Sequence, residues 1–438
     1  MGDFTWVLGI EDTSVHPPAH FAMAPLDEYD LTEHTEHWRA DLTAARDLGA
    51  GAVRYGVNWP LVHTAPDTYD WSTLDERLRF AVEELGLTVI ADLVHYGTPT
   101  WLDGSFADPR YPDVVAAFAG AFAARYRGLV DHVTPLNEPV TTASFCGLRG
   151  VWPPALTGWD GWVRVTLALA EGITRSVAAI RAANPGAVIV HVEASSLFAT
   201  DDPALAGEAE HLTAIGTVPT DLVLGLVGVQ HPMHGWLLEH GAAPEQLARL
   251  RADPARIDVL GVNYYPDLSP RTLVADGTDV VQIATDRWTD GLVTSLRGFE
   301  ARYGLPMMVT ETSIEGTDEV RTAWVRDSVH AVQELVAGGM DLRGYTWWPL
   351  FDFVDWSYAS GGRNVEEFAV PDEVVAARVV GGRKTPSLRR MGLVRLEEQA
   401  DGSLQRVPTG AAAAFGTETG APANRLYNVV TAAADWTP

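Results

Sequence analysis

Two glutamates end strand-like runs in the sequence, at positions where a carboxylate can act in catalysis. Glu138 follows a β-branched run in VTPLNEPV (133–140), and Glu311 closes LPMMVTE (305–311). Two carboxyls roughly 5–5.5 Å apart suit a retaining glycosidase, whereas a wider gap admits a water molecule and leads to inversion. One carboxyl must be protonated to deliver a proton and the other must be ionised to attack carbon, so the pair needs two different surroundings. A single glutamate at a strand end is more often a solvated loop residue, so the hypothesis depends on the pair.

Other residues at the ends of strand-like runs are candidates to create those surroundings. Arg54 is expected to hold Glu311 ionised, because a nearby cation lowers the pKa of a carboxyl. Tyr265 is a candidate hydrogen-bond donor to Glu311, and Asn137 is a candidate partner for the 2-hydroxyl of a sugar. The full set at these run ends is Glu11, Arg54, His95, Asn137, Glu138, Glu193, Asn263, Tyr265, Glu311, Trp348 and Asp352.

Eight strand-like runs alternate with helical patterns along the chain. The runs lie at 6–11, 52–57, 87–95, 132–138, 187–194, 257–265, 305–311 and 342–350. Between them, apolar residues recur at three- and four-residue spacing, which indicates amphipathic helices. Strands that alternate with helices form parallel βα units. The sequence therefore predicts an α/β fold, a (β/α)8 TIM barrel, as a single domain over residues 1–438 with extended βα loops.

The predicted barrel places the two glutamates at one end of the molecule. Active sites of such barrels lie at the carboxyl ends of the strands. Glu138 ends the fourth run and Glu311 ends the seventh, and these two strands face each other across the mouth of an eight-stranded barrel. We therefore expect the two carboxyls to converge over its centre. Residues 359–390 show little periodicity and are interpreted as a long loop or lid within the same domain.

A histidine-rich segment near the N-terminus is interpreted as structural. Glu33, His34, Glu36 and His37 fall within LTEHTEHW (31–38). The chain offers no ligand cluster with the spacing of a structural zinc site, so we expect no metal here and a solvated helix face instead.

Composition and charge exclude several classes of partner. The chain has 31 basic and 58 acidic residues and a formal net charge of −27, which argues against nucleic acid or an anionic membrane surface. No stretch approaches the roughly 20 apolar residues that a membrane-spanning helix needs. The single cysteine, Cys146, permits no disulfide within the chain, and the N-terminus shows no signal-peptide pattern. We therefore expect a soluble, cytoplasmic protein.

Seven segments, spread in order over nearly the whole chain, match the motifs of one enzyme family. They are RYGVNWP (54–60), DLVHYGTPTWL (92–102), TPLNEP (134–139), DVLGVNYYP (258–266), VTETS (309–313), WPLFDFVDW (348–356), and the C-terminal pair GLVRLEE (392–398) and RVPTGAAAAF (406–415). In these motifs the chain resembles glycoside hydrolase family 1, the β-glucosidase family. Each motif alone is weakly specific, but the order of all seven is strongly so.

The resemblance implies a retaining, exo-acting β-glycosidase on a (β/α)8 barrel, with a small-molecule glycoside or oligosaccharide as substrate and no cofactor. It implies that Glu138 is the general acid/base and Glu311 the nucleophile, with Arg54 paired to the nucleophile. The implied sugar-binding residues are His95, Asn137, Asn263, Tyr265, Trp348, Asp355 and Trp356.

The chain departs from the family's pattern at several positions. Tyr96 stands where the family usually has Trp after a sugar-binding His, and Asp355 stands where it has a Glu that contacts O4 and O6. Glu11 lies near the place of a Gln that binds O3 and O4, and TS replaces the usual NG after Glu311. Several of these positions contact the sugar in the family. The pattern therefore predicts intact catalysis but leaves the identity of the sugar undetermined. Only Arg363 is available where phosphoglycosidase members carry a Lys-containing loop, so a phosphorylated substrate is disfavoured.

Two alternatives remain open on the sequence. A transglycosylase would use the same two carboxylates, with an acceptor hydroxyl in place of water. A non-catalytic sugar-binding barrel is motivated by the departures at sugar-reading positions, although the retention of both glutamates argues against it. The aglycone, the linkage and the oligomeric state are also left open.

Overall fold

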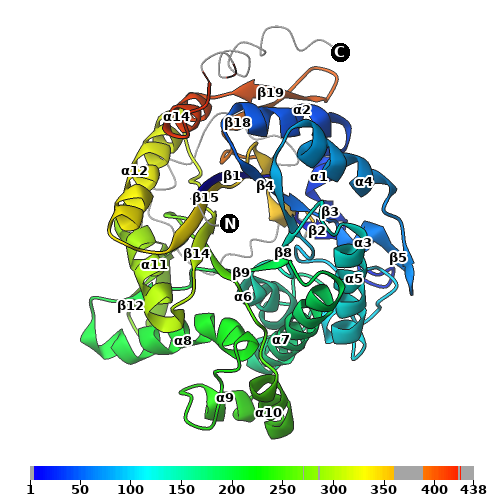
Figure 1. Cartoon of the computed structure of the whole chain (residues 1–438). Helices are drawn as coiled ribbons and strands as arrows, with labels where there is room; N and C mark the ends of the chain where they lie inside the picture. The colour runs from blue at the N-terminus through cyan, green and yellow to red at the C-terminus, as the bar shows by residue number, and fades with distance from the viewer. Residues whose placement is uncertain (1–3, 270, 285–286, 360–387, 423–424, 426–438) are drawn as a thin grey trace.

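Eight parallel strands close into a barrel in the computed structural model (Figure 1). The structure describes residues 4–269, 271–284, 287–359, 388–422 and 425. Around the barrel the strands follow the order β1-β15-β14-β11-β9-β8-β7-β4. Their bounds are β1 Thr5–Gly9, β4 Ala52–Gly56, β7 Thr88–Asp92, β8 His132–Thr134, β9 Val188–Ala194, β11 Val259–Asn263, β14 Met307–Glu311 and β15 Leu342–Trp347. The predicted (β/α)8 barrel is confirmed. Seven of the strands fall within the predicted runs, and β1 begins one residue before its run.

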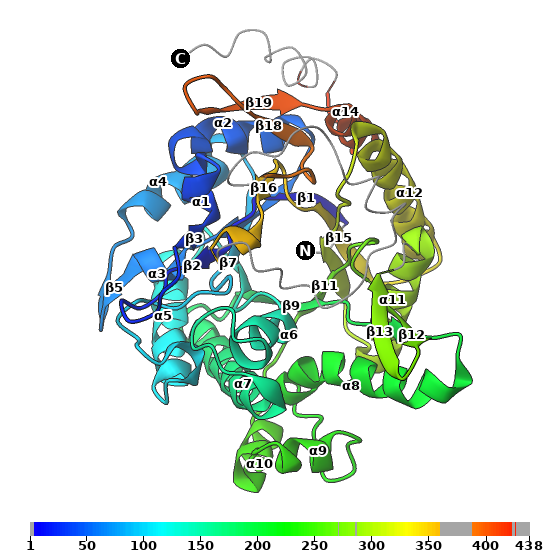
Figure 2. The same cartoon turned by 180° about the vertical axis from the view of Figure 1, so that it is seen from behind.

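Helices form a ring around the barrel in both views (Figures 1 and 2). They are α2 His34–Asp47, α4 Ser72–Arg79, α5 Tyr111–Arg125, α7 Gly158–Ala183, α8 Ala206–Val223, α11 Trp288–Tyr303 and α12 Asp318–Ala337. Shorter helices lie in the connections, namely α1 Glu28–Leu31, α3 Trp59–Val62, α6 Pro139–Ala143, α9 His234–Glu239, α10 Pro244–Ala252 and α14 Gly410–Glu418. Helical turns occupy Phe80–Glu84, Ser105–Ala107, Ser144–Leu148, Pro203–Leu205 and Trp356–Tyr358.

Small strands lie outside the barrel. They are β2 Ser14–Val15, β3 Leu26–Asp27, β5 His63–Ala65, β6 Thr68–Tyr69, β10 Phe198–Ala199, β12 Arg271–Asp276, β13 Asp279–Ala284, β16 Phe353–Val354, β17 Leu388–Arg389, β18 Val394–Glu398 and β19 Leu404–Pro408. β12 and β13 form an antiparallel pair after β11, and β18 and β19 form another near the C-terminus. The expected long loop at 359–390 lies outside the described residues from 360 to 387.

The barrel interior is filled by a layer of apolar side chains. Seven of them form a cluster separate from the larger core between strands and helices, namely Val7, Ala52, Ile90, Val190, Val192, Val259 and Met308. Successive side chains of a strand point to opposite faces, so residues two apart share a face. Arg54 and Asp92 lie two residues beyond Ala52 and Ile90, and therefore point into the barrel above this apolar layer.

The C-terminal hairpin of β18 and β19 covers the segment that was expected to be a solvated helix face. His34 is fully buried, with Nδ1 at 2.8 Å from Asp41 Oδ2 and Nε2 at 2.9 Å from the Tyr55 hydroxyl. Arg406 of β19 donates from Nε and Nη2 to the two Asp41 carboxylate oxygens, each at 3.1 Å. The expectation of solvent exposure was wrong for His34, because residues more than 350 positions away in the sequence cover it.

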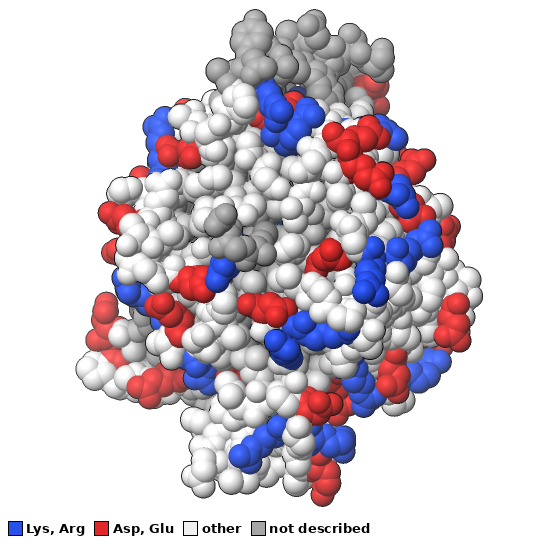
Figure 3. Space-filling view, in the orientation of Figure 1, with Lys and Arg blue, Asp and Glu red and all other residues white. Residues whose placement is uncertain are grey.

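Charged side chains of both signs are interspersed on the face of the molecule drawn in Figure 3. Among the described residues, none of the helices combines the length and the apolar character that a bilayer-spanning segment needs.

The buried pair of Asp41 and Arg406 yields a test of how the C-terminal hairpin is held. Asp41→Asn leaves the guanidinium buried beside an uncharged partner, so we expect it to lower the free energy of unfolding by about 3 kcal/mol. Urea denaturation followed by tryptophan fluorescence measures the change. Glu83→Gln is the matched control, because it breaks the exposed Arg79–Glu83 pair and should leave the midpoint unchanged. An unchanged midpoint for Asp41→Asn as well would show that the pair does not secure the hairpin.

Candidate active site

Arg54 lies at the centre of a hydrogen-bond network at the carboxyl ends of the barrel strands. Its side chain is fully buried. Nη1 donates to Glu311 Oε1, and Nη2 donates to Asp92 Oδ2 at 2.5 Å and to Asn137 Oδ1 at 2.7 Å. A guanidinium only donates and keeps its charge, so its burial requires acceptors and negative partners such as these.

Glu311 ends β14 and accepts hydrogen bonds at both carboxylate oxygens. Arg54 donates to Oε1, and the Tyr265 hydroxyl donates to Oε2 at 2.7 Å. Burial raises the pKa of Glu311 to about 8; the Arg54 charge opposes this rise, and the neighbouring Glu138 carboxylate adds to it. The ionisation of Glu311 therefore depends on the charge of Glu138 as well as on Arg54.

Glu138 sits at a strained turn between β8 and α6. Its φ of 42° lies in the left-handed region, which is uncommon for a residue with a side chain. β8 ends at Thr134, before the predicted run does, because Pro135 and Pro139 have no N–H to donate to a ladder. Glu193 of β9 accepts a hydrogen bond from the Val140 backbone N–H at 3.2 Å and so holds the turn from the neighbouring strand.

Neutral donors hold both oxygens of Glu138. The Tyr96 hydroxyl donates to Oε2 at 2.6 Å, and Asn263 Nδ2 donates to Oε1 at 2.8 Å. The Thr310 hydroxyl donates to Asn263 Oδ1 at 2.6 Å, which turns the Asn263 amide N–H toward Glu138. Glu311 thus has a cation among its donors, whereas the hydrogen-bond donors to Glu138 are uncharged.

His95 lies between two aspartates and Asn137. Its Nδ1 is 2.8 Å from Asp12 Oδ1 and 3.0 Å from Asp92 Oδ2, and its Nε2 is 3.1 Å from Asn137 Nδ2. Because Asn137 Oδ1 faces Arg54, its amide N–H groups face His95 and Tyr96. Burial lowers the pKa of His95, but the two aspartates outweigh burial and raise it well above its usual value. The Nδ1 proton therefore faces the two aspartates, and Nε2 faces the Asn137 amide.

The same three groups are the candidate metal ligands among the described residues. Ligand atoms of Asp12, Asp92 and His95 lie within 4.8 Å of one another. However, Arg54 and the Nδ1 proton of His95 already compensate the two carboxylates. The donor set therefore fits a salt-bridged cluster better than a dication site.

Trp348 forms one wall of the network. Its ring stacks on His95 with the centroids 5.6 Å apart and an interplanar angle of 3°, and Arg54 Cζ lies 4.7 Å from its centroid. The indole Nε1 donates to Glu11 Oε2 at 2.9 Å. A Cβ at Gly9 would lie 1.8 Å from a carbon of this ring, so β1 must end in glycine to admit Trp348.

Trp356 and Asp355 are less directly connected. The Trp356 ring packs against Tyr96 at a centroid distance of 5.3 Å and against Trp152 at 5.4 Å. The Asp355 side chain accepts a hydrogen bond from the Ser357 backbone N–H at 2.9 Å, which makes it a cap of the turn Trp356–Tyr358.

The structure brings most of the candidate residues together. Contacts within a single network join Arg54, His95, Asn137, Glu138, Asn263, Tyr265, Glu311 and Trp348. Asp352 lies apart: it is buried and accepts hydrogen bonds from Arg390 and from the Gly392 and Leu396 backbones, which ties the chain after β15 to the C-terminal segment.

Sequence reasoning missed Asp12 and Asp92. Asp92 is a charged residue inside the otherwise apolar run LTVIADLVH (87–95), and that contrast was an available signal. Asp12 lies in a loop after β1 and offered no comparable signal. Burial raises the pKa of Asp12 to about 6, against the lowering effect of His95.

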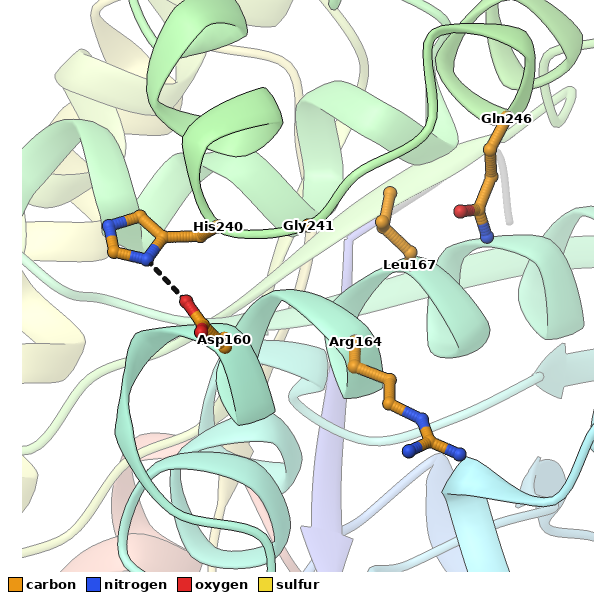
Figure 4. A pocket seen from close by; sticks show the side chains of 6 residues that line it. All are labelled: Asp160, Arg164, Leu167, His240, Gly241 and Gln246. Atoms are coloured by element: carbon orange, nitrogen blue, oxygen red, sulfur yellow. Dashed lines mark hydrogen bonds and ion pairs between the residues drawn. The ribbon is translucent and has the colours of Figure 1, made fainter.

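A pocket of about 270 Å³ lies outside the barrel (Figure 4). Its lining side chains come from the start of α7 and from the region of α9 and α10, namely Asp160, Arg164, Leu167, His240, Gly241 and Gln246. His240 Nδ1 and Asp160 Oδ1 are 2.7 Å apart across one side of it. None of these residues belongs to the Arg54 network.

Comparisons with known proteins agree on one group of enzymes. No family model matches the chain. The chain is 25% identical over 395 residues to a bifunctional β-D-glucosidase/β-D-fucosidase of Bifidobacterium breve, covering 77% of this chain and 83% of that protein. It is 26% identical to the thermostable β-glucosidase B of Thermobispora bispora, covering 82% and 80% of the two chains. The solved structure of a family 1 β-glucosidase from Thermotoga maritima superposes with a TM-score of 0.74 at 16% identity, covering 95% of this chain and 97% of that one.

Removal of the central cation should destabilise the barrel in a pH-dependent way. Arg54→Gln leaves Glu311 and Asp92 without their buried partner, so we expect a loss of about 3–5 kcal/mol in the free energy of unfolding. A carboxyl with a raised pKa in the folded protein, as in Glu311, adds stability below its unfolded pKa, and this contribution is lost as the pH rises through about 8. Arg54 lowers the pKa of Glu311, so its removal raises that pKa further and makes the variant lose more stability than the parent protein as the pH rises. The stability deficit of Arg54→Gln should therefore grow between pH 5 and pH 9.

Urea midpoints of both proteins at pH 5, 7 and 9 measure this dependence. Arg249→Gln serves as the control, because its exposed pair with Glu171 should change stability little at any of these pH values. A deficit that stays constant with pH would mean that Arg54 does not govern the ionisation of Glu311.

Proposed function

We propose that this chain, as a divergent member of glycoside hydrolase family 1, is a retaining, exo-acting β-glycosidase that hydrolyses β-O-glycosidic bonds through a covalent glycosyl-enzyme. We further propose that residues 1–438 act as one catalytic unit. The observation that carries this proposal is the unequal environment of the two glutamates: Glu311 receives hydrogen bonds from a guanidinium and a phenol, and Glu138 from a phenol and an amide.

Glycosylation is the first half of the proposed reaction. A carboxylate of Glu311 attacks the anomeric carbon, and the bond to the aglycone oxygen breaks as Glu138 delivers its proton to that oxygen. The Arg54 charge and the Tyr265 hydroxyl favour the ionised form of Glu311 that this step needs. The competent form has Glu311 ionised and the proton on Glu138.

Deglycosylation is the second half. Glu138, now ionised, removes a proton from a water molecule, and the water oxygen attacks the anomeric carbon as the ester bond to Glu311 breaks. Two displacements at the same carbon retain the β configuration. Both carboxyls then return to their starting forms, so no cofactor is needed to balance the reaction.

The sugar is proposed to bind between Trp348 and the polar groups around it. Stacking on the Trp348 ring and hydrogen bonds with Asn137, Asn263 and His95 would orient it, with Tyr265 beside the nucleophile. The half-exposed Trp356 and Asp355 are proposed to lie at the rim of the sugar site.

Aryl β-glycosides test the reaction and the two roles. We expect turnover of at least one member of a panel of aryl β-glucosides, galactosides and fucosides, with no measurable turnover by Glu311→Gln. We expect Glu138→Ala to slow glycosides with poor leaving groups by roughly 10²–10⁴-fold and activated ones much less, because only the former need the proton.

A mechanism-based fluoro-sugar and peptide mapping identify the nucleophile independently of turnover. Label on Glu311 supports the proposal, and label elsewhere reassigns the nucleophile. Absence of both turnover and label across the panel would refute the enzymatic function. Product analysis with added alcohols separates hydrolysis from transfer to an acceptor.

The pH dependence of kcat/KM tests the ionisation of the nucleophile. The raised pKa of Glu311, about 8, means that this carboxyl loses its proton only near that pH. Attack needs the ionised carboxylate, so we expect kcat/KM for an activated leaving group, which needs little acid assistance, to rise as the pH rises through about 8. Circular dichroism at each pH controls for unfolding, and a rate that does not change across this pH would contradict the assignment of Glu311.

A further inference from the structure

Tyr96 places a hydroxyl between Asn137 and the carboxylate of Glu138. It follows His95 in the loop after β7 and is 2% exposed, with a φ of 72° in the left-handed region. Its ring contacts the rings of His95, Trp152 and Trp356 at centroid distances of 4.4, 5.2 and 5.3 Å. Backbone and ring are thus both fixed, which leaves the hydroxyl little freedom to leave Glu138.

The direction of the hydrogen bonds around Tyr96 is set by Arg54. Because a guanidinium cannot accept, the Asn137 oxygen faces Arg54 Nη2 at 2.7 Å and the Asn137 amide nitrogen faces the Tyr96 hydroxyl at 2.9 Å. The tyrosine oxygen therefore accepts from Asn137, and its single proton points to Glu138 Oε2 at 2.6 Å. The series of hydrogen bonds therefore has one direction, from Arg54 through Asn137 and Tyr96 to Glu138.

The hydroxyl remains a donor over the working pH range. Burial raises the pKa of Tyr96 well above 10, and the Glu138 and Glu311 carboxylates add to this effect. A phenol that keeps its proton beside a buried carboxylate stabilises the ionised form of that carboxylate.

We infer that Tyr96 is a positioning residue that favours the ionised form of Glu138 and relays the state of Glu311 to it through Arg54 and Asn137. This inference rests on the proposed function. It assigns Tyr96 to the base half of the reaction, in which Glu138 must be ionised to activate water. The same donor weakens Glu138 as an acid, so the site favours glycosides whose leaving groups need little protonation.

The relay links the two halves of the reaction. While Glu311 is ionised, its negative charge partly compensates the positive charge of Arg54. Once Glu311 becomes an ester, that charge is less compensated and polarises Asn137 and Tyr96 more strongly, because hydrogen bonds in a chain reinforce one another. Tyr96 then donates more strongly to Glu138 at the stage when Glu138 must act as a base.

Other groups also act on Glu138 and must stay constant in any test. Glu193 of β9, Tyr265 after β11 and Glu311 of β14 interact with its charge. Asn263 of β11 donates to its second oxygen, and Arg54 of β4 reaches it through Asn137. Tyr96→Phe alters none of these side chains.

Tyr96→Phe removes the hydroxyl and keeps the ring. We expect the alkaline limb of kcat/KM for a poor leaving group to move up by about one pH unit, the size of one lost hydrogen bond to a charged group. For an activated glycoside, kcat reports deglycosylation. The acid limb of its kcat profile should also move to higher pH. Tyr265→Phe is the matched comparison, because it removes the phenol donor of Glu311 and should raise the acid limb of kcat/KM instead.

Tyr126→Phe is the control for the loss of a tyrosine hydroxyl far from the network, since Tyr126 donates to Asp75. The acid and alkaline limbs of its pH profiles should match those of the parent protein. Thermal unfolding verifies that each variant is folded. A Tyr96→Phe protein with reduced rates but unmoved limbs would overturn the inference and leave Tyr96 as a packing residue.

A titration that needs no turnover separates this inference from the proposed function. In protein labelled with ¹³C-glutamate, the Glu138 carboxyl signal is identified by its loss in Glu138→Gln. Its titration midpoint should be higher in Tyr96→Phe than in the parent protein, and equal midpoints would overturn the role of Tyr96. Absence of glycoside turnover by the parent protein would instead refute the proposed function, whatever the midpoints are.

Discussion

The buried guanidinium of Arg54 is the charge on which the arrangement of the barrel mouth depends. It is fully buried and holds Glu311, Asp92 and Asn137 at once. Without a cation at this point, two carboxylates would face each other in a medium of low polarity, which is costly. The donor-only chemistry of the guanidinium also decides how Asn137 is turned, and Asn137 in turn orients Tyr96 and His95.

The barrel makes that guanidinium position possible. Parallel strands present their carboxyl ends at one edge, and the alternation of side chains sets Arg54 and Asp92 directly above an apolar layer that excludes water from below. Gly9 leaves room for Trp348 over Arg54. The C-terminal hairpin then completes the outer wall by covering α2 through Arg406.

The two glutamates are alike in chemistry and differ in the charge of their partners. Each accepts one phenol hydrogen bond and one N–H hydrogen bond, but the N–H group belongs to a guanidinium for Glu311 and to an amide for Glu138. This difference is small in geometry and large in electrostatics, because charge interactions are strengthened in a buried site. A similar fold at 16% identity to a β-glucosidase structure therefore says less about chemistry than these four contacts do.

The eight-strand pattern and the two glutamates were readable from sequence, because buried parallel strands are continuous apolar runs and strand-end polar residues interrupt them. Glu138 and Glu311 stood out for that reason, as did Arg54 and Tyr265. The same reasoning put Asp352 among the strand-end polar residues, where it serves instead to hold the C-terminal segment. It also left His34 in solvent, because the residues that cover His34 come from the far end of the chain.

Sequence by itself determined the fold class, the order of the strands and the identity of the paired carboxyls, since these follow from periodicity and from residues adjacent in the chain. Only the tertiary structure decided that Asp12 and Asp92 flank His95, that Tyr96 donates to Glu138, and which way the Asn137 amide points. Those features depend on donors and acceptors from different strands. Their pairing is set by barrel closure and by the one residue, Arg54, that can only donate.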